Sequence, residues 1–222
     1  MLISSKHNFI FVHIYKCGGT SVSSALVPYA NLRFRFTYQW LISRKIVALV
    51  ERTLGIQSMG QQIFTGFHKH ASAAEIRRRL GPDLYDSYYS FSFVRNPYSL
   101  VSSLYRYISG TTSHADHVLV RDMSFDEFVH YHIHSNPLTQ CSFLSDSKGR
   151  LLVKFVGRFE NLAGDFNQLC NELNIPSATL RHLNRSVDSY RLSLASLSTV
   201  SKQQIRNYYE DDFNAFAYPS TV

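Results

Sequence analysis

Short, dense runs of hydrophobic residues divide the chain and predict the strands of one sheet. Residues 9–14 are too uniformly apolar for a strand with one solvent-exposed face, and further buried strands are predicted at residues 89–94 and 151–156. Dense β-branched and aromatic runs are typical of strands buried on both faces of a parallel sheet. A shorter run at 63–66 predicts a fourth strand.

Between these runs the apolar positions recur at helical spacing. Ser72 and Ser124 are the predicted N-cap residues of two helices. Gly81-Pro82 predicts the end of the first of them. Strands that alternate with helices, without a repeat or a low-complexity linker, indicate an α/β fold with a central parallel sheet flanked by helices. We expect a single domain over residues 1–222. The helices are predicted at about residues 20–26, 42–54, 72–80, 97–108, 124–132, 160–173 and 201–213.

Composition and charge narrow the class of protein. The 222 residues are 45% hydrophobic and 18% charged, which is ordinary globular composition and excludes a disordered tail protein. The formal net charge of +7 favours an anionic ligand, polymer or membrane surface. We find no signal peptide and no apolar run of about 18 residues that could span a membrane. With three cysteines and no CxxC pair, the sequence predicts a soluble cytoplasmic protein.

The turn after the first strand carries the strongest chemical signal. Glycines at this place allow backbone N–H groups to approach an anion, and the helix that follows points its positive end at the same place. The arrangement is P-loop-like, but the lysine precedes the glycines instead of following them, which disfavours an ordinary kinase or ATPase. The candidate phosphate-binding residues are Lys16, Cys17, Gly18, Gly19, Thr20 and Ser21.

A second candidate phosphate site follows the strand at 89–94. Arg95 lies at the carboxyl end of this strand, where ligands of open α/β sheets bind. Ser103 is eight residues further on, about two helical turns. An arginine fork with a serine hydroxyl can bind a monophosphate. The simpler alternative is a surface arginine beside a capping turn.

Together these segments resemble the carbohydrate-type sulfotransferase family, which includes the uronyl 2-O-sulfotransferases. The first is similar to the family motif P-K-T-G-G-T-S, and the second to R-N-P-x-x-R-x-x-S-x-Y. The resemblance extends, in the same order, through residues 66–72, 156–162 and 182–186. The chain departs from the motifs where Tyr15, Cys17 and Leu100 replace the proline, the threonine and the second arginine.

The resemblance implies transfer of a sulfuryl group from 3′-phosphoadenosine 5′-phosphosulfate to an acceptor hydroxyl on a carbohydrate, which leaves 3′-phosphoadenosine 5′-phosphate. It implies no metal. Lys16 would neutralise charge on the leaving phosphate oxygen, while the glycine turn holds the 5′-phosphate. Arg95 and Ser103 would hold the 3′-phosphate. A late loop that closes over the nucleotide would be formed by Asn184, Arg185 and Ser186.

Two groups of histidines are candidates for chemistry. His68 and His70 resemble the H-x-H segment of the uronyl enzymes, which implies that His68 is the general base and that His70 assists it or binds substrate. His130, His132 and His134 invite a metal hypothesis. Because residues i and i+2 of a helix do not share a face, we expect helix-surface or interface histidines instead.

Other functions fit parts of the pattern. A phosphoryl-transferring P-loop enzyme would share the fold, and a non-catalytic binder of nucleotide or polyanion would share the glycine turn. A nucleic-acid binder would explain the net charge, but no recognised binding motif accompanies it. The run Arg77-Arg78-Arg79 is typical of a solvated helix face, and it could attract an anionic acceptor.

Overall fold

The computed structural model describes residues 1–31, 67–176, 180 and 197–220. The chain divides into two compact units, one of Met1–Phe93 with Ser142–Leu183 and one of Val94–Cys141 with Asn184–Val222. The strand predicted at 63–66 and the helix predicted at 42–54 lie outside the described residues. That residues 1–222 form a single domain stays a prediction.

The first unit is built on a four-stranded sheet with the order β1-β2-β3-β4. β2 pairs with β3 in parallel, with Phe11 opposite Phe91, but β1 pairs with β2 antiparallel. The sheet is therefore mixed, and the expected parallel sheet was wrong in this respect. Only four residues join β1 to β2, whereas a parallel connection needs a dozen or more, so these two strands can pair only antiparallel. The strands are β1 (Leu2–Ser4), β2 (Phe9–Phe11), β3 (Tyr89–Val94) and β4 (Phe155–Arg158).

The predicted strands differ from the observed ones mainly at their ends. The run at 89–94 is β3 as predicted, while the run at 9–14 is regular only over Phe9–Phe11. The third strand begins later than predicted, at Phe155, because Leu151 pairs only in an isolated bridge with Ser145.

Aromatic side chains fill the core around the sheet. Phe11 stacks on Phe91 with ring centroids 5.3 Å apart, and Phe93 meets Phe155 edge to face at 6.4 Å. Phe9 and Phe91 are fully buried as well. The dense apolar runs in the sequence therefore correspond to a packed aromatic layer shared by three strands.

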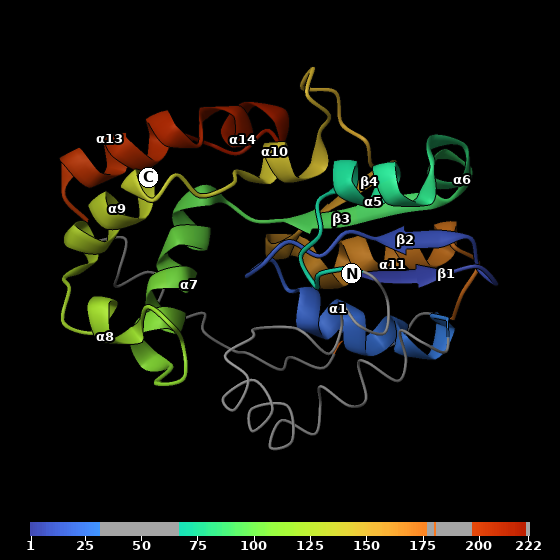
Figure 1. The fold of residues 1–222 in the computed structure, drawn as a ribbon, viewed down its shortest axis with the longest axis horizontal. Helices are drawn as coiled ribbons and strands as arrows, with labels where there is room; N and C mark the ends of the chain where they lie inside the picture. The colour runs from blue at the N-terminus through green and yellow to red at the C-terminus, as the bar shows by residue number, and fades with distance from the viewer. Residues whose placement is uncertain (32–66, 177–179, 181–196, 221–222) are drawn as a thin grey trace. The chain divides into compact units, whose positions relative to one another are not determined.

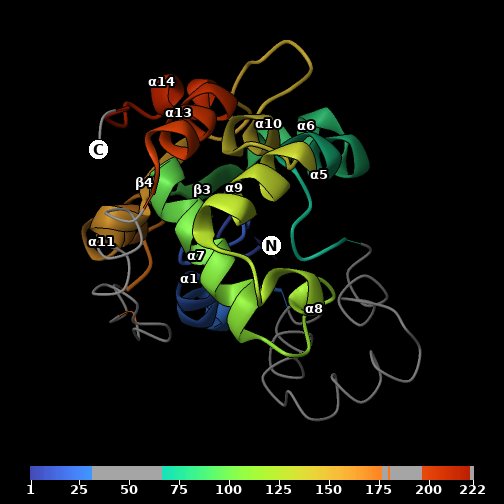
Figure 2. The same cartoon turned by 90° about the vertical axis from the view of Figure 1, so that its left-hand side faces the viewer.

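Helices cover both faces of this sheet. Seen from two directions, α11 lies on one face, and α5 with α6 on the other (Figures 1 and 2). Ser72 caps α5 by accepting a hydrogen bond from the Glu75 backbone N–H, as its sequence pattern predicts. The helices are α1 (Gly19–Leu26), α5 (Ala73–Leu80), α6 (Pro82–Ser87) and α11 (Leu162–Glu172), with 3₁₀ turns at Val27–Tyr29 and Phe159–Asn161.

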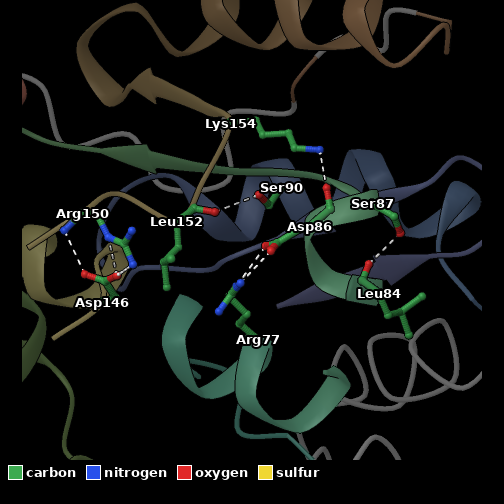
Figure 3. A network of polar contacts seen from close by, with 9 residues as sticks. All are labelled: Arg77, Leu84, Asp86, Ser87, Ser90, Asp146, Arg150, Leu152 and Lys154. Atoms are coloured by element: carbon green, nitrogen blue, oxygen red, sulfur yellow. Dashed lines mark hydrogen bonds and ion pairs between the residues drawn. The ribbon is translucent and has the colours of Figure 1, made fainter. Parts of the chain in front are cut away.

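A polar network ties α5, α6 and β3 to the segment before β4 (Figure 3). Arg77 of α5 donates two hydrogen bonds to the Asp86 carboxylate of α6, at 2.9 and 2.6 Å. The Lys154 ammonium donates to the Asp86 carbonyl at 2.7 Å, and the Ser90 hydroxyl of β3 donates to the Leu152 carbonyl at 3.2 Å. The Lys154 and Ser90 contacts connect segments that lie more than 60 residues apart in the sequence.

The second unit consists of helices around a second core. The capping box predicted at Ser124 is confirmed, since its hydroxyl accepts from the Glu127 N–H and the Glu127 carboxylate accepts from the Ser124 N–H. The helix predicted over 201–213 is two helices, because Tyr209 leaves the helical conformation at φ −102° and ψ 23°. The helices are α7 (Pro97–Gly110), α8 (His117–Val120), α9 (Phe125–His134), α13 (Thr199–Tyr208) and α14 (Glu210–Ala215). α10 (Gln140–Leu144) crosses the boundary between the units.

The helices seen in the structure give no sign of a membrane span, as far as the described ranges extend. None of them combines the length and the apolar character that crossing a bilayer requires.

Gly157 tests how tightly β4 packs on β3. A Cβ added at Gly157 would overlap the Phe93 ring, whereas a Cβ at Gly110, near the end of α7, would meet nothing within 4 Å. We expect Gly157→Ala to lower the free energy of unfolding by about 1–3 kcal/mol through overpacking. Gly110→Ala should leave it unchanged or raise it by up to about 1 kcal/mol. Urea denaturation measures both, and equal stabilities of the two variants would contradict this packing.

Candidate active site

The turn between β2 and α1 brings a lysine and two glycines to the start of a helix. Lys16 and Gly18 both have left-handed backbone conformations, with φ of 61° and 76°. Gly18 is the N-cap residue of α1, and its carbonyl accepts from the N–H groups of Ser21 at 3.0 Å and Val22 at 3.2 Å. The predicted strand, turn and helix are thus present, and the first turn of α1 begins at Gly19.

Packing requires a glycine at position 19, and the left-handed backbone favours one at position 18. A Cβ on Gly19 would overlap the imidazole of His13, so the backbone and this ring are in direct contact. A Cβ on Gly18 would lie 2.8 Å from a methyl group of Leu162, at the start of α11. From the sequence, the glycines were interpreted as allowing an anion to approach the backbone. The structure shows that they also allow the turn to pack directly against His13 and α11.

His70 lies against the end of the β2 segment. Its Nδ1 is 2.8 Å from the His13 carbonyl oxygen, and the two imidazole rings meet edge to face at 4.7 Å. The Tyr15 ring, in the glycine turn, is 6.1 Å from the His70 ring. Because a carbonyl only accepts, Nδ1 of His70 carries the proton, and Nε2 keeps its lone pair.

Burial keeps this pair of histidines neutral. Desolvation lowers the pKa of His70 to about 4, and only the hydrogen bond to the His13 backbone opposes it. Desolvation also lowers the pKa of His13 well below its ordinary value. His13 was not among the residues predicted for the site, although a histidine inside a dense apolar strand is itself a signal of a buried, specific contact.

His68 and His70 differ more than their spacing predicts. The i, i+2 argument assumes an extended segment, but residues 67–70 form a bend and a turn, in which the Ala71 N–H donates to the His68 carbonyl at 3.1 Å. His68 is exposed, while His70 is partly buried against the strand end. The Lys69 carbonyl between them accepts from the amine of Met1 at 2.6 Å.

Arg95 belongs to the second unit and follows β3 directly. It is only 4% exposed, and its Nε donates to the Ser99 hydroxyl at 2.6 Å. Ser103, four residues further along α7, is also buried. Ser103 was predicted as the partner of Arg95 and Ser99 was not, although the i, i+4 spacing from Arg95 to Ser99 could have indicated Ser99. Asn184, Arg185 and Ser186 lie outside the described residues.

The three histidines of α9 do not act as one group. His132 is buried, with its Nε2 2.8 Å from the Tyr209 hydroxyl and its ring stacked on Phe128. His130 and His134 are exposed, with their ring centroids 4.0 Å apart. The expectation that i and i+2 histidines do not share a face is confirmed, but His132 is a core residue and not the surface histidine that the sequence predicted. Within residues 1–31, 67–176, 180 and 197–220, no group of three or more His, Cys, Asp or Glu side chains could hold a metal ion.

The arginines of α5 are largely engaged in local contacts. Arg77 forms the paired hydrogen bonds to Asp86 (Figure 3), and Arg79 forms an ion pair with Glu75 at 3.1 Å. The Arg79 guanidinium also lies over the Phe67 ring, 5.4 Å from its centroid. Much of the positive charge predicted to attract an anionic acceptor is therefore offset by neighbouring carboxylates.

Comparison with known proteins defines the class. The chain matches the Sulfotransferase family model over residues 1–219 and belongs to this family, which includes carbohydrate sulfotransferases. It is therefore a transferase that moves sulfuryl groups, and the resemblance seen in its motifs is confirmed. An uncharacterized protein of Archaeoglobus fulgidus is 29% identical over 118 residues, which cover 52% of this chain and 93% of that protein. No solved structure matches the chain.

The buried His132 makes stability depend on pH. Burial lowers its pKa to about 4, so below the ordinary value of 6.5 the unfolded chain binds a proton that the folded one does not. The contribution of neutral His132 to the free energy of unfolding is therefore fully present above pH 6.5 and is lost as the pH falls towards 4. His132→Gln should therefore reduce the loss of unfolding free energy between pH 7 and pH 5 by about 2 kcal/mol. His130→Gln, at an exposed site, is the matched control in urea denaturation, and an unchanged pH dependence in His132→Gln would contradict the burial.

Proposed function

We propose that this sulfotransferase uses 3′-phosphoadenosine 5′-phosphosulfate as donor and a carbohydrate hydroxyl as acceptor, with 3′-phosphoadenosine 5′-phosphate as the product. In the reaction, a bond forms between the acceptor oxygen and sulfur while the bond between sulfur and the phosphate oxygen breaks. The observation that carries the proposal is the turn of Lys16 and Gly18 at the start of α1, in a chain of the sulfotransferase family.

The residues of the turn fit an anionic 5′-phosphosulfate. The backbone at Gly19 lies at the N-terminus of α1, where N–H groups and the helix dipole favour negative charge. Lys16 is partly exposed and supplies a positive charge for the leaving phosphate oxygen, and Thr20 and Ser21 supply hydroxyl donors. Cys17 is 1% exposed, so it would contribute its backbone and not its thiol.

The second phosphate would bind at Arg95. Its guanidinium, held by the Ser99 hydroxyl, can form charge-assisted hydrogen bonds to the 3′-phosphate, with Ser103 as a further donor. We also propose that Asn184, Arg185 and Ser186 close over the nucleotide, as the family resemblance implies. No metal is required, because lysine and arginine supply the positive charge.

We propose His70 as the general base, with His68 in a supporting or substrate-binding role. Three observations support this reversal of the order expected from the sequence. The hydrogen bond to the His13 carbonyl leaves Nε2 of His70 free of a proton, burial keeps the ring neutral, and Tyr15 of the turn lies beside it. His68 is exposed and precedes the turn residues Lys69 and His70. Imidazole can accept the proton of an alcohol as the new bond to sulfur forms.

We place the protein in the cytoplasm. The described cysteines, Cys17, Cys141 and Cys170, are free thiols. Free thiols are typical of a reducing compartment, which supports the location expected from the sequence.

The direct test is sulfuryl transfer to a panel of acceptors, detected by mass. Wild-type protein should add one sulfuryl group to a carbohydrate hydroxyl when 3′-phosphoadenosine 5′-phosphosulfate is present, and a chelator should not reduce the rate. Transfer to amines or phenols alone would contradict the carbohydrate acceptor. Phosphoryl transfer from ATP that depends on magnesium would instead indicate a P-loop phosphotransferase.

Arg95 should distinguish nucleotides by their 3′-phosphate. Arg95→Ala should weaken binding of adenosine 3′,5′-bisphosphate by about 2–3 kcal/mol, because a charge-assisted contact in an enclosed place is lost. Binding of adenosine 5′-monophosphate should change little. The matched control is Arg121→Ala, since Arg121 is an exposed arginine of the same unit. Equal affinity of the wild-type protein for both nucleotides, measured by calorimetry, would refute the 3′-phosphate site.

The two histidines should differ in their effect on turnover. His70→Ala should lower kcat by about 10²–10⁴-fold, the usual contribution of a general base, with little change in nucleotide affinity. His68→Ala should have a smaller effect. Because the neutral ring is the active form and the pKa of His70 is about 4, its titration should leave kcat/KM level between pH 6 and pH 8. If His68→Ala lowers kcat more than His70→Ala does, His68 is the general base, as the family resemblance implies, and the proposal for His70 is wrong.

A further inference from the structure

A side-chain amide from a distant segment holds the peptide of Arg95. Gln140 is 1% exposed and stands at the start of α10. The Arg95 N–H donates to its Oε1 at 2.7 Å, and its Nε2 donates to the Arg95 carbonyl at 2.8 Å. Arg95 lies just beyond the last residue of β3, so the amide of Gln140 satisfies two buried peptide groups there.

Gln140 is itself fixed by Asp212 of α14. Oδ2 of Asp212 accepts from the Gln140 backbone N–H at 3.0 Å and from its Nε2 at 3.1 Å. Oδ1 accepts from the Cys141 N–H at 2.7 Å. Asp212 is fully buried, so desolvation raises the pKa of its carboxyl while these N–H donors oppose the rise.

These contacts give the Gln140 amide one orientation. Its Nε2 has two hydrogens, and they go to the Arg95 carbonyl and to Asp212. A flipped amide would set Nε2 against the Arg95 N–H and Oε1 against the carboxylate, so both contacts would become repulsive. The carboxylate therefore selects the amide orientation that the Arg95 peptide needs.

Arg95 is therefore held by hydrogen bonds at both its backbone and its side chain. Gln140 bonds both the backbone N–H and the backbone carbonyl of Arg95, and the Ser99 hydroxyl accepts from its Nε. Asn96 then caps α7 by accepting from the N–H groups of Tyr98 and Ser99. An arginine held in this way has little rotamer freedom to lose when its planar fork meets a phosphate.

We propose that Gln140 and Asp212 are positioning residues that set Arg95 for a 3′-phosphate. This inference rests on the proposed function, in which Arg95 contacts that phosphate. Gln140 acts on the Arg95 peptide, and Asp212 acts through Gln140. Their contribution is to the preference for nucleotides that carry a 3′-phosphate over nucleotides that lack one.

The experiment compares the affinities of full-length variants for adenosine 3′,5′-bisphosphate and adenosine 5′-monophosphate by calorimetry. Gln140→Ala should weaken binding of the bisphosphate by about 10- to 100-fold and that of the monophosphate by no more than about 2-fold. Gln203→Ala is the matched control, because Gln203 is an exposed glutamine of the same unit that bonds only locally, to Asn207. It should bind both nucleotides as the wild-type protein does.

Two conservative variants separate positioning from folding. Asp212→Asn keeps the size of the side chain but replaces one acceptor with a donor, so it should reduce the preference for the bisphosphate through Gln140. The Gln140→Glu side chain can still accept from the Arg95 N–H, but it can donate only when its carboxyl is protonated. The preference of this variant for the bisphosphate over the monophosphate, relative to that of the wild-type protein, should therefore recover as the pH is lowered from 8 to 6. Circular dichroism at the temperature of the assay confirms folding, and if Gln140→Ala does not fold, these two variants decide.

The outcomes separate this inference from the function on which it rests. A wild-type protein without preference for the bisphosphate would refute the 3′-phosphate site and the inference with it. If Arg95→Ala loses the preference while Gln140→Ala and Asp212→Asn keep it, only the positioning role is overturned. Equal losses for both nucleotides in these variants would also overturn it, because they would indicate a general structural role.

Discussion

The parallel pairing of β2 with β3 is the constraint on which the first unit depends. Its hydrogen bonds continue past the regular strand, where the Val12 N–H donates to the Phe91 carbonyl at 2.9 Å and the Ser92 hydroxyl donates to the Val12 carbonyl at 2.8 Å. The pairing therefore extends to Val12, and the ring of the next residue, His13, meets the backbone of Gly19. If the pairing were to shift by one residue, His13 would change faces, and the turn would lose the surface on which it packs.

Both units use the same device where a strand ends. The peptide groups beyond a β-ladder have no neighbouring strand, and leaving one buried and unbonded costs about 1–3 kcal/mol. In the first unit, His70 donates to the His13 carbonyl, and in the second, Gln140 bonds both polar groups of Arg95. In each case the side chain comes from about 45 or more residues away. The contact that removes an unsatisfied group thus also fixes a residue with a proposed role in catalysis or binding.

This device explains what the sequence could and could not predict. Apolar runs, caps and the glycine turn are local signals, and they correctly indicated β3, the capping box at Ser124 and a helix after the glycine turn. That helix begins at Gly19, one residue earlier than predicted. β1 has only three residues, too few to show a pattern. Gln140 and Asp212 look like ordinary polar residues, because what distinguishes them is a partner 72 residues away. The protonation of His70 likewise depends on a carbonyl that only the folded chain brings to its Nδ1.

The net charge is a poorer guide to the binding site than the burial of individual cations. A total of +7 indicates an anionic partner, but Arg77 and Arg79 already face carboxylates of their own unit. An exposed ion pair of this kind is screened by water and salt and is worth little. Arg95 is 4% exposed, and in such a place a hydrogen bond to a charged group is strengthened by the low local dielectric. Affinity for an anionic donor should therefore depend on a few enclosed cations whose geometry the fold determines. The sum of charges over the surface would then affect how fast the donor arrives more than how tightly it binds.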